Sequence, residues 1–182
     1  MRGLSRSGTM EYFMVPDIRC AESSDLNRMV EIYNHYVSNT HVTFDTEPFA
    51  VGARTHWFTQ FTETGPYRLL VADADGDILG YASSTNFKPR AAYNTSVETT
   101  IYLDPAHTGK GIGLILYGEL LRQLQDDVSV HRAYGGVALP NPASVAVHEK
   151  LGFVRVGSYP EVGFKFGKFW DVDWFEKDVA KR

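Results

Sequence analysis

Three glycines, Gly109, Gly111 and Gly113, alternate with other residues between a strand-like segment (96–103) and a helical pattern (about 110–125). Glycines leave successive backbone N–H groups uncovered, and the start of a helix adds the positive end of its dipole. Both features favour the binding of a phosphate group at this turn. A glycine-rich turn without a ligand is the alternative interpretation.

The spacing of the glycines excludes two common phosphate motifs. A dinucleotide-binding G-x-G-x-x-G that begins at Gly109 requires glycine at position 114, which is Leu114. One that begins at Gly111 meets Leu116 at the corresponding place. A Walker loop requires Ser or Thr after Gly109-Lys110, where Gly111 stands instead.

Glu98 is the candidate general base. The segment 96–103 alternates like a strand, so Glu98 shares one side with Thr100 and Tyr102, opposite an apolar set that contains Val97. A carboxylate in the middle of a strand is unusual, and proton abstraction would account for it. A solvated outward residue is the alternative.

His148 is the second candidate for proton transfer. Asn141, Ser144 and His148 are spaced at i, i+3 and i+7, so a helix over 142–150 places them on one face. Imidazole can donate a proton near neutral pH. The alternatives are a histidine that is hydrogen-bonded to a neighbour and an asparagine that only caps the helix.

A short basic segment could bind an anionic substrate. Lys88, Arg90 and Tyr93 lie between two strand-like segments, and the guanidinium fork suits a carboxylate or a phosphinate. These residues would fit a doubly anionic amino acid. A solvated basic loop is the alternative.

Composition narrows the class of protein. Of 182 residues, 43% are hydrophobic and 22% charged, and the net charge of −4 gives no support to nucleic-acid binding. No apolar run approaches the roughly 20 residues that span a bilayer. Cys20 is the one cysteine and fits a core position, and with no signal-like segment this favours the cytoplasm. The remaining histidines lack metal-ligand spacing, so the sequence predicts no metal site.

The order of elements predicts one α/β (mixed α+β) domain over 17–182, preceded by a poorly ordered leader or cloning remnant at 1–16. Ser23 and Ser24 offer N-caps for the first helix, and Asn141 for the last. The strands are expected at 15–20, 67–73, 78–86, 96–103, 133–139, 154–159 and 164–175. The helices are expected at about 24–37, 51–62, 110–125 and 142–150.

Two of these patterns resemble signatures of the GCN5-related N-acetyltransferases. Residues 108–113 (Thr-Gly-Lys-Gly-Ile-Gly) resemble the R/Q-x-x-G-x-G/A motif, and residues 141–153 resemble the family's late helix, which begins near an Asn and ends in Gly-Phe. They lie about 30 residues apart in the expected order. The resemblance implies a central, mostly antiparallel twisted sheet flanked by helices, with acetyl-CoA as co-substrate.

Further segments resemble one particular branch of this superfamily. Residues 33–37, 44–48, 88–93, 97–102 and 163–172 are similar to the phosphinothricin (methionine sulfoximine) N-acetyltransferase branch, and the similarity runs from about 18 to 179. It implies acetyl transfer, by direct attack, to the α-amine of a small glutamate- or methionine-like acceptor, and a homodimer with the C-terminal β structure near its interface. An acceptor that is a protein N-terminus or lysine, and a non-catalytic CoA-binding domain, are the alternatives.

The resemblance also implies roles for single residues. The backbone of 109–113, including Lys110 and Ile112, would bind the pyrophosphate, although Thr108 replaces the usual Arg or Gln and one side-chain contact is lost. Glu98 matches the branch's proposed base, acting directly or through water, and His148 matches its histidine at the position of a proposed acid. The remaining implied residues are Asn141 and Ser144 beside the pantetheine arm, a backbone N–H near Ile101 or Leu103 as oxyanion donor, and Phe44 on the acceptor side. Plain core packing is the alternative for Phe44.

Overall fold

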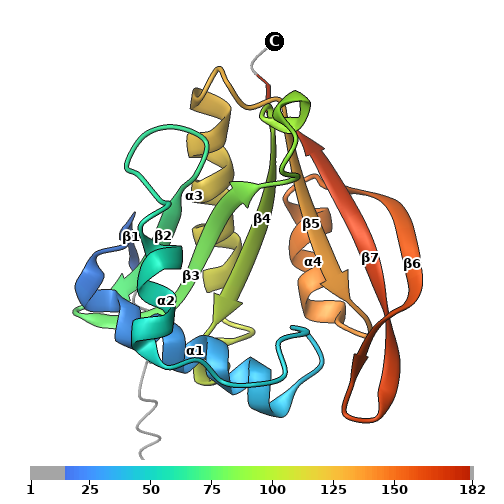
Figure 1. Cartoon of the computed structure of the whole chain (residues 1–182). Helices are drawn as coiled ribbons and strands as arrows, with labels where there is room; N and C mark the ends of the chain where they lie inside the picture. Colours follow the sequence, from blue (N-terminus) through green and yellow to red (C-terminus); the bar gives the residue numbers. More distant parts are fainter. Residues whose placement is uncertain (1–14, 181–182) are drawn as a thin grey trace, which may run out of the picture.

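Residues 15–180 are described by this computed structural model, and they form a seven-stranded sheet in the order β1-β2-β3-β4-β5-β7-β6 (Figure 1). β4 and β5 are parallel, and all other neighbouring strands are antiparallel. The strands are β1 (Asp17–Cys20), β2 (Leu69–Ala74), β3 (Asp77–Asn86), β4 (Ser96–Leu103), β5 (Arg132–Ala138), β6 (Val154–Lys165) and β7 (Lys168–Asp178). The predicted mixed, mostly antiparallel sheet is confirmed. Of the predicted leader 1–16, only Val15 and Pro16 lie within the described residues.

Helices cover both faces of the sheet. α3 (Ile112–Asp126) and α4 (Pro142–Lys150) pack on one face, and α1 (Leu26–Asn39) and α2 (Val51–Phe58) pack on the other. The core of α3 repeats at helical spacing, since Leu116, Leu120 and Leu124 are fully buried. Burying each such side chain contributes roughly 1.5–3 kcal/mol, so α3 is held firmly against β2, β3 and β4.

The first helix begins differently from the prediction. Ser23 and Ser24 do not cap α1, because they lie within a 3-10 turn (Ser23–Asp25). The carboxylate of Asp25 instead accepts a hydrogen bond from the backbone N–H of Glu22 at 2.7 Å, and Arg19 holds the same carboxylate at 2.8 Å. An ion-paired aspartate therefore orders the entry to α1.

The second helix is shorter than predicted. α2 ends at Phe58 rather than near residue 62, because Gln60 and Phe61 donate to carbonyls three residues earlier. Such tighter turns end an α-helix.

The strands β4 and β5 separate along their length. Their backbone pairing covers only Ser96–Glu98 and residues 132–134, although β4 continues to Leu103 and β5 to Ala138 (Figure 1). The outer neighbours of both strands stay paired along this stretch, so the sheet opens between β4 and β5.

No helix within residues 15–180 is long and apolar enough to cross a membrane. In the same part of the chain, no group of three or more His, Cys, Asp or Glu side chains is arranged to hold a metal ion.

Candidate functional site

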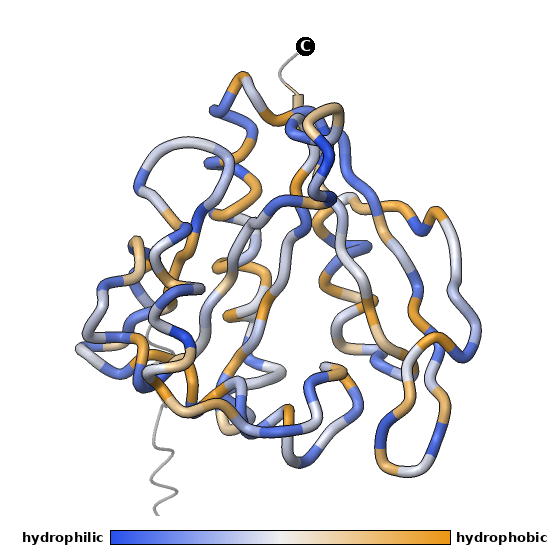
Figure 2. The backbone as a smooth tube through the Cα atoms, in the orientation of Figure 1, coloured by the Kyte–Doolittle hydropathy of each residue, from blue (hydrophilic) through white to orange (hydrophobic). Residues whose placement is uncertain are grey.

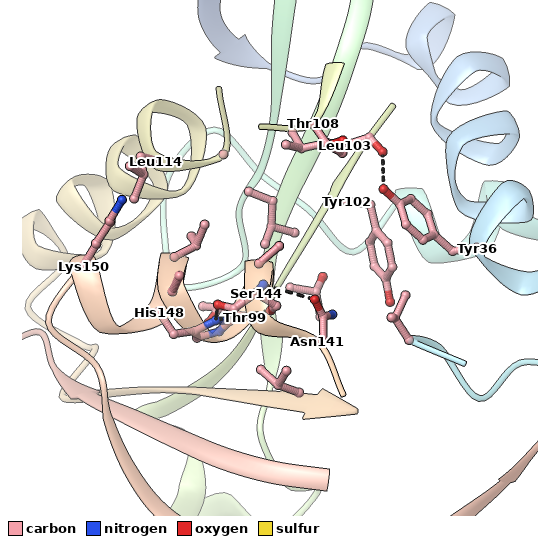
Figure 3. A pocket seen from close by; sticks show the side chains of 18 of the residues that line it. Tyr36, Thr99, Tyr102, Leu103, Thr108, Leu114, Asn141, Ser144, His148 and Lys150 are labelled. Atoms are coloured by element: carbon pink, nitrogen blue, oxygen red, sulfur yellow. Dashed lines mark hydrogen bonds between the residues drawn. The ribbon is translucent and has the colours of Figure 1, made fainter. Parts of the chain in front are cut away.

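A cavity of about 610 Å³ lies at the opening between β4 and β5 (Figure 3). Most of its wall comes from four segments that are far apart in the sequence. They are the glycine turn (Thr108, Gly109, Gly111, Gly113), β4 (Thr99–Leu103), β5 (Gly136–Ala138) and α4 (Asn141, Ser144, His148 and Lys150 among others). The two predicted signatures therefore meet in one place.

The glycine turn is shaped by backbone conformation. Gly109 and Gly111 have φ of 75° and 82°, in the left-handed region that favours glycine. Gly111 is the N-cap residue of α3, and no side chain caps the helix there. The first amides of a helix have no acceptor within the helix. In α3 the N–H of Leu114 donates to the carbonyl of Gly111, so the amides of Ile112 and Gly113 are the ones left for a ligand.

The other residues of the turn contribute unequally. Thr108 lines the cavity, but its hydroxyl donates to the carbonyl of Pro105 at 3.1 Å. Lys110 is exposed and Ile112 is buried in the core, and neither lines the wall. In the predicted pyrophosphate site, these two residues could therefore contribute only backbone groups and, for Lys110, the positive charge of its side chain.

Ile101 and Leu103, on the open edge of β4, both line the cavity. The carbonyl of Leu103 accepts a hydrogen bond from the hydroxyl of Tyr36 at 2.6 Å (Figure 3). Ile101 and Leu103 pack on α3 beside Gly113, where a Cβ would lie 3.4 Å from the Leu103 side chain and 3.7 Å from that of Ile101, which are ordinary contact distances.

Asn141 both caps α4 and lines the cavity. Its Oδ1 accepts from the backbone N–H of Ser144 at 3.1 Å (Figure 3). The N-cap interpretation is therefore confirmed, and it is compatible with a contact to a ligand, since both Asn141 and Ser144 face the cavity.

His148 is 3% exposed, with both ring nitrogens engaged inside the protein. Nδ1 lies 2.8 Å from the carbonyl of Ser144, so Nδ1 is the donor, and Nε2 lies 3.2 Å from the hydroxyl of Tyr117. Burial lowers the pKa of His148, partly offset by the Ser144 hydrogen bond. The ring is therefore neutral at neutral pH, with its proton on Nδ1.

Glu98 lies in the last backbone pair before the opening, between Thr85 of β3 and Tyr134 of β5. It does not line the cavity, but Thr100, two residues along the same side of β4, does. Burial raises the pKa of the Glu98 carboxyl, and the positive charge of Lys88 acts in the opposite direction.

Of the predicted acceptor residues, Lys88 and Tyr93 lie together near Glu98, and Arg90 lies in the turn between them. Lys88 and Tyr93 gather around Phe87, at 5.0 and 6.1 Å from its ring, and Phe87 stacks on Tyr134 beside Glu98. Arg90 is the N-cap residue of a short turn, Ala91–Tyr93. None of Lys88, Arg90 and Tyr93 lines the cavity.

Phe44 is placed by packing against the β6–β7 hairpin. A Cβ on Gly163 would lie 2.1 Å from Cζ of Phe44, so the ring occupies the space above that glycine. The buried Lys165 also holds this loop, donating to the carbonyl of Thr43 at 2.7 Å. The adjacent Val42 lines the cavity, so the loop forms part of the wall.

Several lining residues were not identified from the sequence. Lys150 extends toward Leu114 beside the glycine turn (Figure 3) and supplies a cation there. Its spacing was the available signal, since Lys150 lies seven residues after Ala143 and three after Val147, on the helical face that lines the cavity. Tyr36 and Tyr102 line the other end, and burial raises the pKa of Tyr102 to about 12, so its hydroxyl stays protonated.

Comparison with known proteins agrees with this geometry. A model of the acetyltransferase (GNAT) family matches residues 29–153. The chain is 48% identical over 174 residues to the phosphinothricin N-acetyltransferase of Streptomyces coelicolor, covering 94% of this chain and 99% of the relative. It is 32% identical over 166 residues to the L-methionine sulfoximine/L-methionine sulfone acetyltransferase of Pseudomonas aeruginosa, with 91% and 96% covered.

A solved structure shares the whole architecture. The GNAT superfamily phosphinothricin acetyltransferase from Sinorhizobium meliloti, in complex with acetyl-CoA, matches with a TM-score of 0.86 and 32% identity. The match covers 92% of this chain and 90% of that one. The resemblance carried by the glycine turn and the late helix is confirmed, and the chain belongs to the acetyltransferase (GNAT) family.

Proposed function

We propose that this chain transfers the acetyl group of acetyl-CoA to the α-amine of a small glutamate- or methionine-like acceptor, such as phosphinothricin, methionine sulfoximine or methionine sulfone. The observation that carries the proposal is the cavity at the β4–β5 opening, which joins the glycine turn to the side of β4 that holds Glu98. The phosphinothricin and methionine sulfoximine enzymes among the relatives support the acceptor class.

The residues present fit acetyl-CoA. The uncapped start of α3 can bind the pyrophosphate through backbone N–H groups, and Lys150 adds positive charge beside it. Asn141, Ser144 and the open edge of β4 can hold the pantetheine arm. When bound, the thioester supplies the activated acetyl group.

The proposed chemistry assigns one task to each group. Glu98 accepts a proton from the acceptor amine, directly or through water, and its raised pKa brings it closer to the operating pH than an ordinary glutamate. A backbone N–H of β4 near Ile101 or Leu103 stabilises the carbonyl oxygen as charge develops. His148 is proposed as the acid, which requires a proton on Nε2 in addition to the one on Nδ1 and a break in the hydrogen bond between Nε2 and Tyr117.

An assay of thiol release tests the function. The chain is incubated with acetyl-CoA and, separately, with phosphinothricin, methionine sulfoximine, methionine sulfone and peptides with free N-termini. We expect turnover with at least one of the small acceptors. Tight binding of CoA without turnover of any of them would refute the acceptor class, and turnover of peptides alone would move the assignment to a protein acceptor.

Removing the basic acceptor residues is expected to weaken acceptor binding selectively. Changing Lys88 and Arg90 to Ala should raise the KM for the acceptor about tenfold, because roughly 1.4 kcal/mol of charge-assisted binding corresponds to a factor of ten. The KM for acetyl-CoA should stay the same. Initial rates under varied acceptor measure this. Arg122→Ala, an exposed cation on α3, is the control, and an unchanged acceptor KM in the double variant would remove both residues from the site.

We also propose a homodimer through the C-terminal hairpin. Hydrophobic residues recur along β6 and β7 (Figure 2), and Val154, Val156, Phe164 and Phe169 are 52–61% exposed. β6 is the edge of the sheet, and an exposed apolar edge strand is a pairing surface.

Charge on this edge should separate the dimer. Changing Val154 and Val156 to Lys should halve the mass measured by light scattering after gel filtration, because it places two charges in the apolar contact. Val128→Lys, at a fully exposed valine outside the hairpin, should leave the mass unchanged. A wild-type chain that elutes as a monomer at micromolar concentration would contradict the dimer.

A further inference from the structure

A buried chain of side-chain hydrogen bonds links three elements behind the cavity. The hydroxyl of Tyr117 on α3 lies 2.6 Å from Oγ1 of Thr99 on β4 and 3.2 Å from Nε2 of His148 on α4. The three residues are 0%, 2% and 3% exposed. Buried polar groups are costly unless they are paired, so this network fixes the relative positions of its members.

The network sits where β4 leaves β5. The last backbone pair joins Glu98 to Tyr134, and Thr99 is the next residue along β4. Its hydroxyl lies 3.0 Å from the carbonyl of Tyr134, so a side-chain hydrogen bond can join the two strands at the point where their backbone pairing ends. The two strands stay connected at this point without continuing to pair, and the cavity begins immediately beyond it.

Glycine on β5 makes room for the imidazole. A Cβ on Gly135 would lie 2.5 Å from Nε2 of His148 and 3.4 Å from the hydroxyl of Tyr117. Any side chain there would displace the ring. The ring therefore packs directly on the β5 backbone, next to the carbonyl that Thr99 holds.

We propose that Tyr117 is a positioning residue for acetyl transfer: it holds the His148 ring and the Thr99 hydroxyl together and thereby fixes the point at which β4 and β5 diverge. This inference rests on the proposed function. It assigns to α3 a second task besides presenting its N-terminus.

The phenol hydroxyl suits this task in both charge states of His148. Nδ1 donates to the carbonyl of Ser144 in either state. With a neutral ring, Tyr117 donates to Nε2 and accepts from the hydroxyl of Thr99, whose single hydrogen is then turned away from the carbonyl of Tyr134. With a protonated ring, Nε2 donates to Tyr117, which donates to Thr99, which donates to the carbonyl of Tyr134. Phenylalanine would fill the same space and hold neither partner.

The test compares Tyr117→Phe with Tyr81→Phe. Tyr81 is similarly buried, at 2% exposed, but lies on the α1–α2 side of the sheet, away from the Thr99–Tyr117–His148 network. We expect Tyr117→Phe to lower kcat about tenfold or more, with less than a threefold change in the KM for acetyl-CoA, since misplacement of reacting groups costs rate rather than binding. Tyr81→Phe should behave as wild type.

Thr99 provides the second pair of variants. Thr99→Val removes the hydroxyl and should reproduce the loss in kcat, whereas Thr99→Ser keeps the hydroxyl and should retain most of the activity. Rescue by serine separates positioning from simple loss of packing.

The ring of His148 gives a readout that does not need an acceptor. In the free wild-type chain, the long-range 1H–15N spectrum should show a proton on Nδ1 and a hydrogen-bonded Nε2. In Tyr117→Phe, the Nε2 resonance should move toward that of an unpaired imidazole nitrogen. A wild-type kcat together with an unmoved resonance in Tyr117→Phe would overturn the proposal. A wild-type chain that acetylates no acceptor defeats the proposed function instead, and the resonance still decides the positioning role.

Discussion

Replacement of Glu98 by glutamine is expected to lower kcat by about two to four orders of magnitude, the usual contribution of general base catalysis. Glutamine keeps the shape and the burial of the side chain but cannot accept the proton of the amine. The dissociation constant for acetyl-CoA should stay the same, because Glu98 does not line the cavity that would hold it. Initial rates and calorimetric titration with acetyl-CoA measure the two quantities.

The pH dependence of the rate and of the stability should also reflect the ionisation of Glu98. Burial raises the pKa of Glu98, so kcat/KM should fall as the pH drops through a value above that of an ordinary glutamate. A raised pKa in the folded state means that the neutral carboxyl stabilises the fold, and this contribution is lost as the pH rises through the folded-state pKa. Glu98→Gln should therefore melt at or above the wild-type temperature at pH 8, and the two should converge at acidic pH.

Glu149→Gln serves as the control, since it neutralises an exposed carboxylate on α4. It should change neither the rate nor the pH profile. Wild-type turnover by Glu98→Gln would remove Glu98 from the catalytic machinery and favour a water or another group as base.

Local patterns predicted most of the elements. The alternation of Val97, Thr99 and Ile101 against Glu98 and Thr100 placed β4 at its observed bounds, Ser96–Leu103. The helix predicted from about 110 begins at Ile112, because Gly111 takes a left-handed conformation and cannot be part of it. Serine at positions 23 and 24 misled the prediction of the first cap, since the decisive contact is made by Arg19 and Asp25, an ion pair that spacing alone does not reveal.

The environment of the site could not be predicted in the same way. The burial of His148 depends on the absence of a side chain at Gly135 and on the hydroxyl of Tyr117, which lies 31 residues away in the sequence. The early end of β4–β5 pairing is likewise a tertiary property, since both strands continue in extended conformation beyond it. The sequence shows that a histidine, a glycine and a tyrosine stand at these positions, but which of them contact one another is determined only by the tertiary structure.

The glycine turn offers the second large effect. Gly111→Asp is expected to weaken binding of acetyl-CoA at least about a hundredfold, which corresponds to roughly 2.7 kcal/mol. The new carboxylate would lie at the start of α3, next to the place proposed for the pyrophosphate. Both groups are negatively charged, so they would repel each other. Calorimetric titration of acetyl-CoA measures the loss.

Backbone strain must be separated from charge in this experiment, because Gly111 has φ of 82°. Gly76, in the turn between β2 and β3, has φ of 92° and open space at its Cβ position, so Gly76→Asp introduces the same residue with comparable strain away from the cavity. Aspartate tolerates the left-handed region better than most residues, so both variants should fold. We expect Gly76→Asp to bind acetyl-CoA as the wild type does. Equal affinity in Gly111→Asp and the wild type would place the pyrophosphate elsewhere and leave the glycines as a structural turn, whereas a loss confined to Gly111→Asp assigns the phosphate site to the start of α3.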